Sequence, residues 1–234
     1  MPQFRKFPNL KHEPCINETN IMPKQTFFNL PDEKRGKIIG AAIEEFAVNG
    51  YAQTSINSIV ERAEIAKGSI YQYFEDKKDF YLYLVSFVKE SYMSHRAKFV
   101  GNVATQPFRE TLLRTMLFFR EFQEKYPAQV HFYFAMVGDT SIPFDEEISR
   151  IMTEPSLDYM REIIKRAQTD GQIREDVDID MLVFDLVVLI TGFQQATVSR
   201  AMGDYYDIDG RDVETLRENA NSLLDIVFDG IAAG

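Results

Sequence analysis

The sequence predicts an all-α protein, and three observations support this fold class. Apolar residues recur at three- and four-residue spacing in most segments, which is the spacing of one face of an α-helix. Residues that begin or end helices flank these segments, such as Pro31 before the first and Asn49-Gly50 at its end. The sequence lacks both the alternation of apolar and polar residues typical of strands and any internal repeat.

Four helix signals follow one another closely in the first 80 residues. The first helix starts at Pro31, and Thr54 or Ser55 can cap a short second helix. A break of three residues leads into a short third helix that ends near Phe74. Two short helices joined by a tight turn, behind a longer one, predict a helix-turn-helix unit.

The rest of the chain also has helical periodicity. Asp76 caps a fourth helix that begins at Lys77, and Asp79, three residues after the cap, gives roughly the pattern of a capping box. Further helices are expected at 106–126, 128–137, 143–169, 179–202 and 212–230. We divide the chain into a mobile tail at 1–30, a helix-turn-helix domain at 31–76 and a larger helical domain at 77–234.

Composition limits the classes of function. Cys15 is the single cysteine among 234 residues, so we expect no disulfide framework and a reducing, cytoplasmic location. We see no signal peptide, and the longest apolar run, 181–193, is too short to span a bilayer, so we expect no membrane partner. His12 and Cys15 lack further ligands nearby, so we expect no metal and no cofactor. Whether translation starts at Met1 or Met22 stays open.

The net charge of −10 is unevenly distributed along the chain. Residues 1–80 contain 11 Lys/Arg and 11 Asp/Glu, whereas residues 81–234 contain 15 and 25. The acidic part repels nucleic acid, so any DNA binding must come from a local patch in the neutral first third.

The stretch "AKGSIYQYFEDKKDF" at 66–80 has the composition of such a patch. Lys67, Ser69 and Gln72 carry donors or acceptors for base edges, and Gly68 lets the backbone come close to a duplex. Tyr71 and Tyr73 offer hydroxyls and rings, and Lys77 can meet a phosphate at the start of the next helix. In this interpretation Ile70 and Phe74 hold the helix on the core. The alternative is an exposed turn of a helical bundle that binds no DNA.

Residues 50–80, "GYAQTSINSIVERAEIAKGSIYQYFEDKKDF", resemble the amino-terminal domain of the TetR family of bacterial transcriptional regulators. The matching positions are Gly50, Thr54, Ser55, Ile59, Lys67, Gly68, Ser69, Ile70, Tyr71, Tyr73, Phe74 and Lys77. Val60 departs from the usual alanine, and Glu75-Asp76 put two acids at the end expected to face phosphate.

The resemblance implies a homodimer that binds a palindromic operator in double-stranded DNA, usually as a repressor, and is released by a small-molecule effector. The residues implied nearest the bases are Asn57, Lys67, Gly68, Ser69, Tyr71 and Gln72. Those implied nearest phosphate are Thr54, Tyr73 and Lys77. The effector, the operator and target genes, and the choice between repressor and activator stay open.

The larger domain supplies candidates for effector binding and dimerisation. Aromatic residues are dense between 80 and 134, and we expect a largely apolar effector cavity built from Phe118, Phe122, Phe134, Met136 and Phe193. The polar candidates in this pocket are Arg114, His131 and Gln194. The last two helices have broad apolar faces that need partners, and the resemblance implies that they build a four-helix interface between subunits. The interface candidates are Leu182, Leu186, Leu189, Leu216, Leu223 and Val227. Burial within the subunit is the alternative for each.

Two other classes of function compete with a regulator. An enzyme is disfavoured because three widely spaced histidines and one cysteine provide little material for a catalytic site. A helical adaptor that binds only other proteins is the second alternative. Replacing Lys67 and Tyr71 separates these readings, because an adaptor keeps its partner when they are lost.

Overall fold

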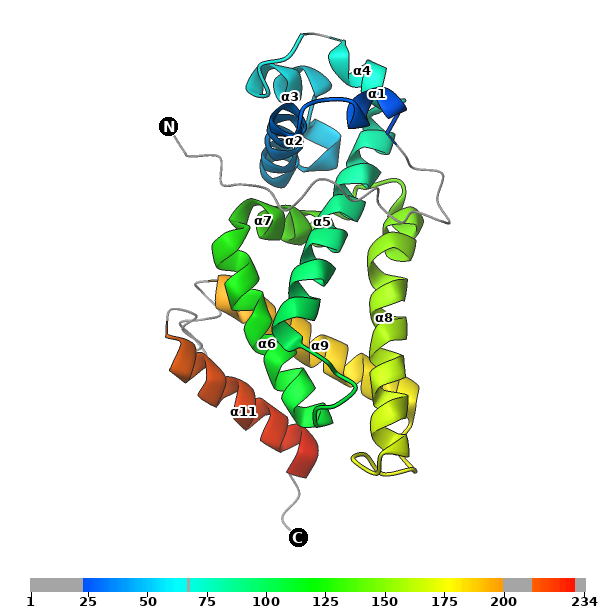
Figure 1. The fold of residues 1–234 in the computed structure, drawn as a ribbon, viewed down its shortest axis with the longest axis vertical. Helices are drawn as coiled ribbons and strands as arrows, with labels where there is room; N and C mark the ends of the chain where they lie inside the picture. The colour runs from blue at the N-terminus through cyan, green and yellow to red at the C-terminus, as the bar shows by residue number, and fades with distance from the viewer. Residues whose placement is uncertain (1–22, 67, 200–211, 230–234) are drawn as a thin grey trace. The chain divides into compact units, whose positions relative to one another are not determined.

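The computed structural model describes residues 23–66, 68–199 and 212–229, and this part of the chain is helical without strands (Figure 1). Its helices are α1 (Gln25–Phe28), α2 (Asp32–Gln53), α3 (Ile56–Arg62), α4 (Ser69–Tyr73), α5 (Lys77–Val100), α6 (Phe108–Lys125), α7 (Pro127–Gly138), α8 (Asp145–Thr169), α9 (Ile179–Val198) and α11 (Val213–Asp229). The predicted all-α class is confirmed, and every helix expected from the sequence is present within a few residues. Only α1 was not foreseen.

The helices divide into two compact units. Unit 1 comprises residues 1–93 and 126–154, and unit 2 comprises residues 94–125 and 155–234. Helices α5 and α8 have residues in both. This division differs from our boundary at Lys77, because the first part of α5 and all of α7 pack into the same core as the amino-terminal helices.

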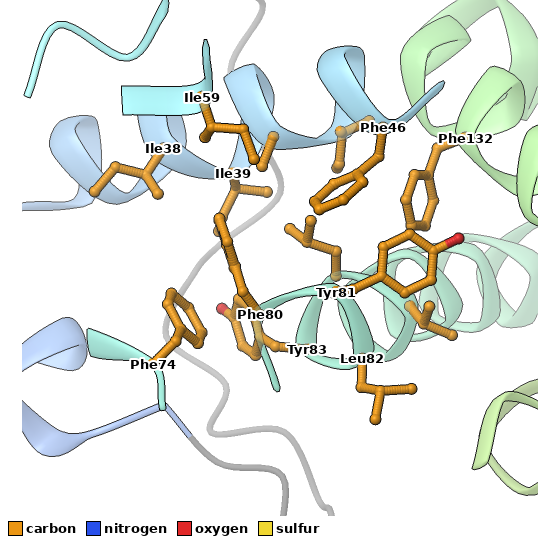
Figure 2. Close-up of a cluster of buried hydrophobic side chains, with 14 of the residues drawn as sticks. Ile38, Ile39, Phe46, Ile59, Phe74, Phe80, Tyr81, Leu82, Tyr83 and Phe132 are labelled. Atoms are coloured by element: carbon orange, nitrogen blue, oxygen red, sulfur yellow. The ribbon is translucent and has the colours of Figure 1, made fainter. Parts of the chain in front are cut away.

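The core of unit 1 is aromatic. Tyr81 of α5 lies between Phe46 of α2 and Phe132 of α7, with ring centroids 4.9 Å and 5.4 Å away (Figure 2). Phe74, just after α4, stacks on Phe80 at 4.3 Å. Each fully buried ring of this kind stabilises the fold by roughly 1.5–3 kcal/mol.

Helix α1 belongs to this core, although the sequence suggested a mobile tail through residue 30. Residues 1–22 lie outside the described part of the chain, but Phe27 is fully buried. Its ring lies 5.0 Å from that of Phe74 and 5.5 Å from that of Tyr83. Arg35 of α2 holds the end of α1, because its Nη1 donates to Phe28 O at 2.7 Å. The expectation for residues 23–30 is therefore wrong.

Unit 2 is built from α6, α9, α11 and parts of α5 and α8. Its core residues include Leu112, Met116, Ile164, Leu186, Phe193, Leu216 and Leu224. The amide of Phe108 at the start of α6 donates to Gln172 Oε1 at 2.6 Å, which satisfies one of the free donors of this helix end.

Helix α9 is apolar over most of its length. The run 181–193 looked too short to cross a bilayer, but the helix continues, and Ile179–Thr197 is long and apolar enough by length and composition. A core helix passes the same test, and Val183, Leu186 and Ile190 do pack in the core of unit 2. These contacts account for the buried side of the helix, and 33% of the apolar window is buried.

Replacing Phe27 with alanine tests the packing of α1. The substitution leaves a cavity among four rings, and we expect it to lower the free energy of unfolding by about 3–5 kcal/mol. Val48→Ala is the control, because Val48 is 78% exposed and its loss costs within about 0.5 kcal/mol. Urea denaturation followed by circular dichroism measures both. Equal values for the two variants contradict the docking of α1.

Candidate nucleic-acid interface

Helices α3 and α4 form a helix-turn-helix. Ser55, and not Thr54, caps α3, because the Ser58 amide donates to Ser55 Oγ at 3.0 Å. After α3 the Ile65 amide bonds to Val60 O, and the Glu64 amide bonds to Glu61 O. This is the Schellman pattern that ends many helices, with Glu64 in the left-handed conformation (φ 55°) that glycine usually takes. The turn between the two helices is therefore fixed by backbone hydrogen bonds.

Gly68 begins α4 for a conformational reason. It caps the helix with φ at 85°, in the left-handed region, and a side chain there would be strained although the space around it is open. The sequence suggested only close approach to a duplex. Lys67, the residue before it, lies outside the described residues.

Helix α4 has one buried and one exposed side. Ile70, and Phe74 just beyond the helix, are fully buried, as their spacing predicted. Tyr71 is 53% exposed, Gln72 is exposed and Ser69 is half-buried. Asn57 of α3 is also exposed. The described side chains that we expected nearest the bases are therefore accessible on α3 and α4.

Two of the three residues expected at phosphates have buried side chains. Thr54 is 2% exposed, and its hydroxyl donates to Gly50 O at 2.8 Å, a carbonyl that also accepts the Thr54 amide. Tyr73 is 6% exposed, and its ring packs 5.7 Å from that of Phe27. The expected phosphate contacts of these two side chains are not supported, because both side chains are used by the fold.

Lys77, the third, holds the start of α5 to the end of α2. Its Nζ donates to Thr54 O at 3.0 Å and to Ala52 O at 3.3 Å, and lies 4.4 Å from the ring centroid of Tyr51. Burial lowers the pKa of this ammonium group. The ammonium group donates to protein carbonyls. Because the side chain is half-buried, this group is only partly accessible to a phosphate.

The capping of α5 agrees with the prediction. The Asp79 amide donates to Asp76 Oδ1 at 2.8 Å, and the Glu75 amide donates back to Asp79 Oδ2 at 3.0 Å. Burial raises the pKa of the Asp79 carboxyl, although the hydrogen bond from Glu75 opposes this. The two acids noted beside the interface thus help to define the junction between α4 and α5.

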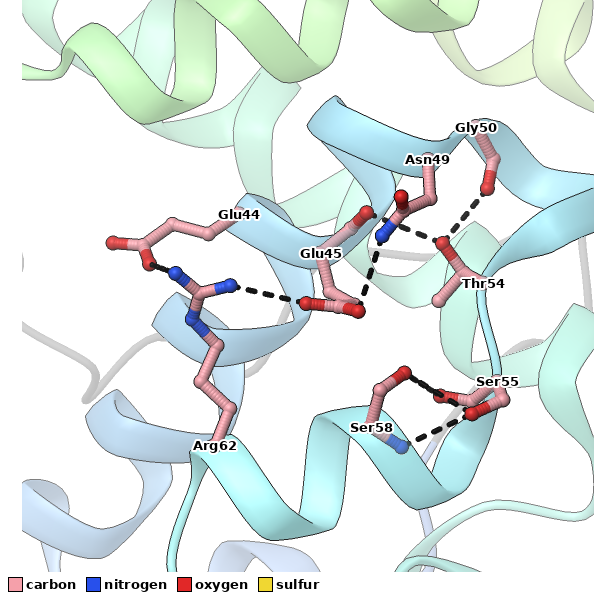
Figure 3. A network of polar contacts seen from close by, with 8 residues as sticks. All are labelled: Glu44, Glu45, Asn49, Gly50, Thr54, Ser55, Ser58 and Arg62. Atoms are coloured by element: carbon pink, nitrogen blue, oxygen red, sulfur yellow. Dashed lines mark hydrogen bonds and ion pairs between the residues drawn. The ribbon is translucent and has the colours of Figure 1, made fainter.

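An ion-pair network joins α3 to α2 (Figure 3). Arg62 lies 3.0 Å from carboxylate oxygens of both Glu44 and Glu45, and Glu45 accepts from Asn49 at 3.1 Å. Exposed pairs of this kind contribute little individually, but together they fix the angle between the two helices. They also occupy the only arginine in α3.

The segment around α1 caps the carboxyl end of α4. The Lys24 amide donates to Tyr73 O at 2.7 Å, and its Nζ donates to Tyr71 O at 3.2 Å. Thr26 Oγ1 donates to Gln72 O at 2.6 Å. Three consecutive carbonyls at the end of α4 thus receive donors from residues 24 and 26, and α1 lies beside α4 (Figure 1). These contacts were not predictable from sequence, because the partners are 46 or more residues apart.

The residues predicted for an effector pocket are divided between the units. Met136 lies in the core of unit 1, with Phe134 half-buried and His131 exposed. Phe118, Phe122, Phe193 and Gln194 are buried in unit 2. Arg114 pairs with Glu110 at 3.1 Å and donates to Val100 O at 2.9 Å. A small hollow in unit 2 lies beside Phe108, Ile163 and Arg166 and is lined by none of the eight predicted residues.

The dimer candidates on α9 form a stripe that faces largely inward. Leu186 is 1% exposed, and Leu182 packs against the core of unit 2. The exposed stripe of this helix consists of Met181, Phe184 and Val188, at 55–61% exposure. The sequence analysis missed these three because α9 is apolar on several sides.

Helix α11 also has some apolar side chains that are buried and others that are exposed. Leu216 is buried at 1%, Leu223 is half-buried and Val227 is 40% exposed. Ile226 and Phe228 are exposed beside Val227. We use the term apolar face for the exposed apolar stripe of each helix, formed by Met181, Phe184 and Val188 on α9 and by Ile226, Val227 and Phe228 on α11.

No cluster of three or more potential metal ligands occurs among the residues that the structure describes. The tail residues His12 and Cys15 lie outside that part.

Comparison with known proteins identifies the family. The family profile described as "Bacterial regulatory proteins, tetR family" matches residues 38–84. The crystal structure of a TetR family transcriptional regulator from Chloroflexus aurantiacus J-10-FL is 30% identical, covers 89% of this chain and 98% of its own, and superposes with a TM-score of 0.69.

Two further matches are to Bacillus subtilis regulators of transcription or fatty acid metabolism, one by sequence and one by structure. The curated fatty acid metabolism regulator protein of strain 168 is 44% identical over 61 residues, which span 25% of this chain and only 30% of that regulator. The structure of the transcriptional regulator FadR in complex with stearoyl-CoA covers 84% of this chain and 98% of its own, with 20% identity and a TM-score of 0.64, which indicates a shared fold. The nearly complete match to the Chloroflexus regulator, together with the matching profile over the helix-turn-helix, shows that this chain belongs to the TetR family of transcriptional regulators.

Proposed function

We propose that this protein is a homodimeric repressor that binds a palindromic operator and is released by a small-molecule effector. The observation that carries the proposal is the division of α4, where Ile70 is fully buried while Tyr71 and Gln72 stand exposed. A helix held in this way presents its outer side chains to a major groove. Asn57, Gly68, Ser69, Tyr71 and Gln72, with Lys67, are the residues we assign to the bases.

The electrostatics favour base recognition over a strong attraction to phosphate. Arg62 and Lys77 are both engaged within unit 1, and the body of the protein is acidic. We also propose that residues 31–76 recognise DNA and that residues 77–234 bind the effector and form the dimer. In this proposal Thr54, Tyr73 and Lys77 hold the helices of the interface in place through contacts inside unit 1.

The apolar face on α9 and α11 supports dimerisation. Exposed Phe and Met side chains concentrated on two helices are typical of a surface that is covered by a partner. A twofold dimer uses the same face on both copies, and two recognition helices held about 34 Å apart reach successive grooves of a palindrome.

A largely apolar effector is consistent with the many aromatic residues between 80 and 134 in the larger helical domain. A solved relative, FadR of Bacillus subtilis, is in complex with stearoyl-CoA, a ligand with a long apolar chain. The alternative function is an adaptor that binds only proteins, and we propose a cytoplasmic location for either. Selection of duplexes from random-sequence DNA by the purified protein separates regulator from adaptor, since an adaptor enriches no sequence.

Replacing Gln72 with alanine tests base recognition. A side-chain contact to a base edge contributes about 1–3 kcal/mol, so we expect the Kd for a selected duplex to rise roughly 5- to 150-fold. Thr153→Ala, an exposed position on α8, is the control and leaves Kd unchanged. Fluorescence anisotropy with a labelled duplex measures both. An unchanged Kd for Gln72→Ala would mean that the Gln72 side chain does not contact a base.

Thr26→Val tests the cap on α4 with an almost isosteric change. Loss of the hydroxyl leaves Gln72 O without its donor, and we expect about 1 kcal/mol less stability and a weaker complex with the selected duplex. Thr26→Ser keeps the hydroxyl and restores both values. If valine and serine behave alike in anisotropy and in urea denaturation, the cap does not position α4.

Val188→Glu tests the apolar face. A charge placed in an interface is desolvated at a cost of several kcal/mol, so we expect the dimer dissociation constant to rise at least about 100-fold. Val48→Glu makes the same change at an exposed valine of α2 and leaves the dimer intact. Sedimentation equilibrium gives both constants. A dimer that tolerates Val188→Glu uses another surface.

A further inference from the structure

Arg96 of α5 is a buried cation. Its residue exposure is 8%, and among the residues that the structure describes no carboxylate pairs with it. Six other arginines of unit 2 pair with carboxylates, and all have more exposed side chains: Arg109, Arg114, Arg120, Arg161, Arg166 and Arg174. Arg217 also has no carboxylate partner among the described residues, but it is exposed, so the buried arginine of the described part of unit 2 is an unpaired one. An isolated buried charge is strongly unfavourable unless another group neutralises it.

The guanidinium is held in a defined orientation. Its central carbon lies 4.0 Å from the ring centroid of Tyr159 on α8, which is stacking distance for a cation on an aromatic face. Its Nε is buried and has no hydrogen-bond partner in the described structure. The ring thus holds one face of the planar group, and of the donors at its edge Nε is buried without an acceptor among the described residues. This edge matches the planar or tetrahedral oxygens of carboxylates and phosphates.

The neighbouring side chains are aromatic. His95, beside Arg96 on α5, lies 6.2 Å from the ring of Phe122 on α6, and Phe99 lies 5.6 Å from Phe118. Gln123, which follows Phe122, has a buried side-chain oxygen without a partner in the same part of the structure. The described residues thus include a guanidinium on α5 and an amide oxygen on α6 with unsatisfied atoms, each next in sequence to a residue of the His95–Phe122 contact.

We infer that the effector is an organic anion with an apolar body, and that Arg96 binds its charged group. The inference rests on the proposed function and narrows the effector to carboxylates or phosphate monoesters. The aromatic residues of α5 and α6 accommodate the apolar body, and Gln123 accepts a hydrogen bond from any donor next to the anion. Binding of the anion supplies the negative counter-charge that Arg96 lacks among the described residues.

Three probes with one chain length test the charge requirement in the full-length protein: octanoate, octyl phosphate and octan-1-ol. Isothermal titration should show at least about tenfold tighter binding of one of the anions than of octanol. The better of the two anions distinguishes carboxylate from phosphate recognition. Arg96→Met should abolish the preference, whereas Arg120→Met, which removes a cation paired with Glu124, should retain it. Octanol binding as tightly as both anions, or no binding of any probe, overturns the inference.

Thermal unfolding without ligand separates a binding role from a structural one. Because Arg96 has no anionic partner among the described residues, Arg96→Met should leave the Tm of the unliganded protein unchanged or raise it. A Tm that falls further than that of Arg120→Met shows that Arg96 is needed for folding and overturns the inference.

The regulatory role is tested separately with the selected duplex. Wild-type protein that prefers the anion, and whose affinity for the duplex changes on adding it, supports both proposals. If no duplex is enriched while the preference depends on Arg96, the anion site stands and the proposed function fails.

Discussion

The burial of Ile70 and Phe74 is the interaction on which the candidate interface depends. Helix α4 has only five residues, too few to be stable alone, because its nucleation cost exceeds the gain from its own hydrogen bonds. Packing of these two side chains, and the donors from Lys24 and Thr26 at its last carbonyls, replace the missing helical length. The outward direction of Tyr71 and Gln72 follows from this anchoring.

Most charged groups around the interface are used to hold its helices together. Arg62 is neutralised by Glu44 and Glu45, and Lys77 is bonded to backbone carbonyls. A module with as many acids as bases has little long-range attraction for a polyanion. Its affinity then depends on geometry at short range, which explains why so many contacts fix the positions of α3 and α4.

The sequence predicted most of the fold, and its errors have physical causes. The capping of α5 by Asp76 and Asp79 is a local pattern and was found. Phe27 was missed because α1 is a single turn between prolines, and only distant partners make it part of the core. On α9 the inward stripe was taken for the interface, since periodicity identifies faces but not which one is covered by the same subunit. The φ of 55° at Glu64 has no sequence signal at all, because glycine is the usual residue there.

The numbers of acidic and basic residues show why the lack of a carboxylate partner for Arg96 in the described structure is informative. Residues 81–234 contain 25 acidic and 15 basic side chains, so carboxylates are not scarce in this part of the sequence. Several more accessible arginines of unit 2 have partners four residues away on their own helices, such as Glu124 for Arg120 and Glu110 for Arg114. A comparable acid near Arg96 would neutralise it at little cost, and it would also compete with an anionic ligand. A site that must bind and release an anion requires a cation without a permanent partner, and the described part of unit 2 keeps one at its most buried arginine.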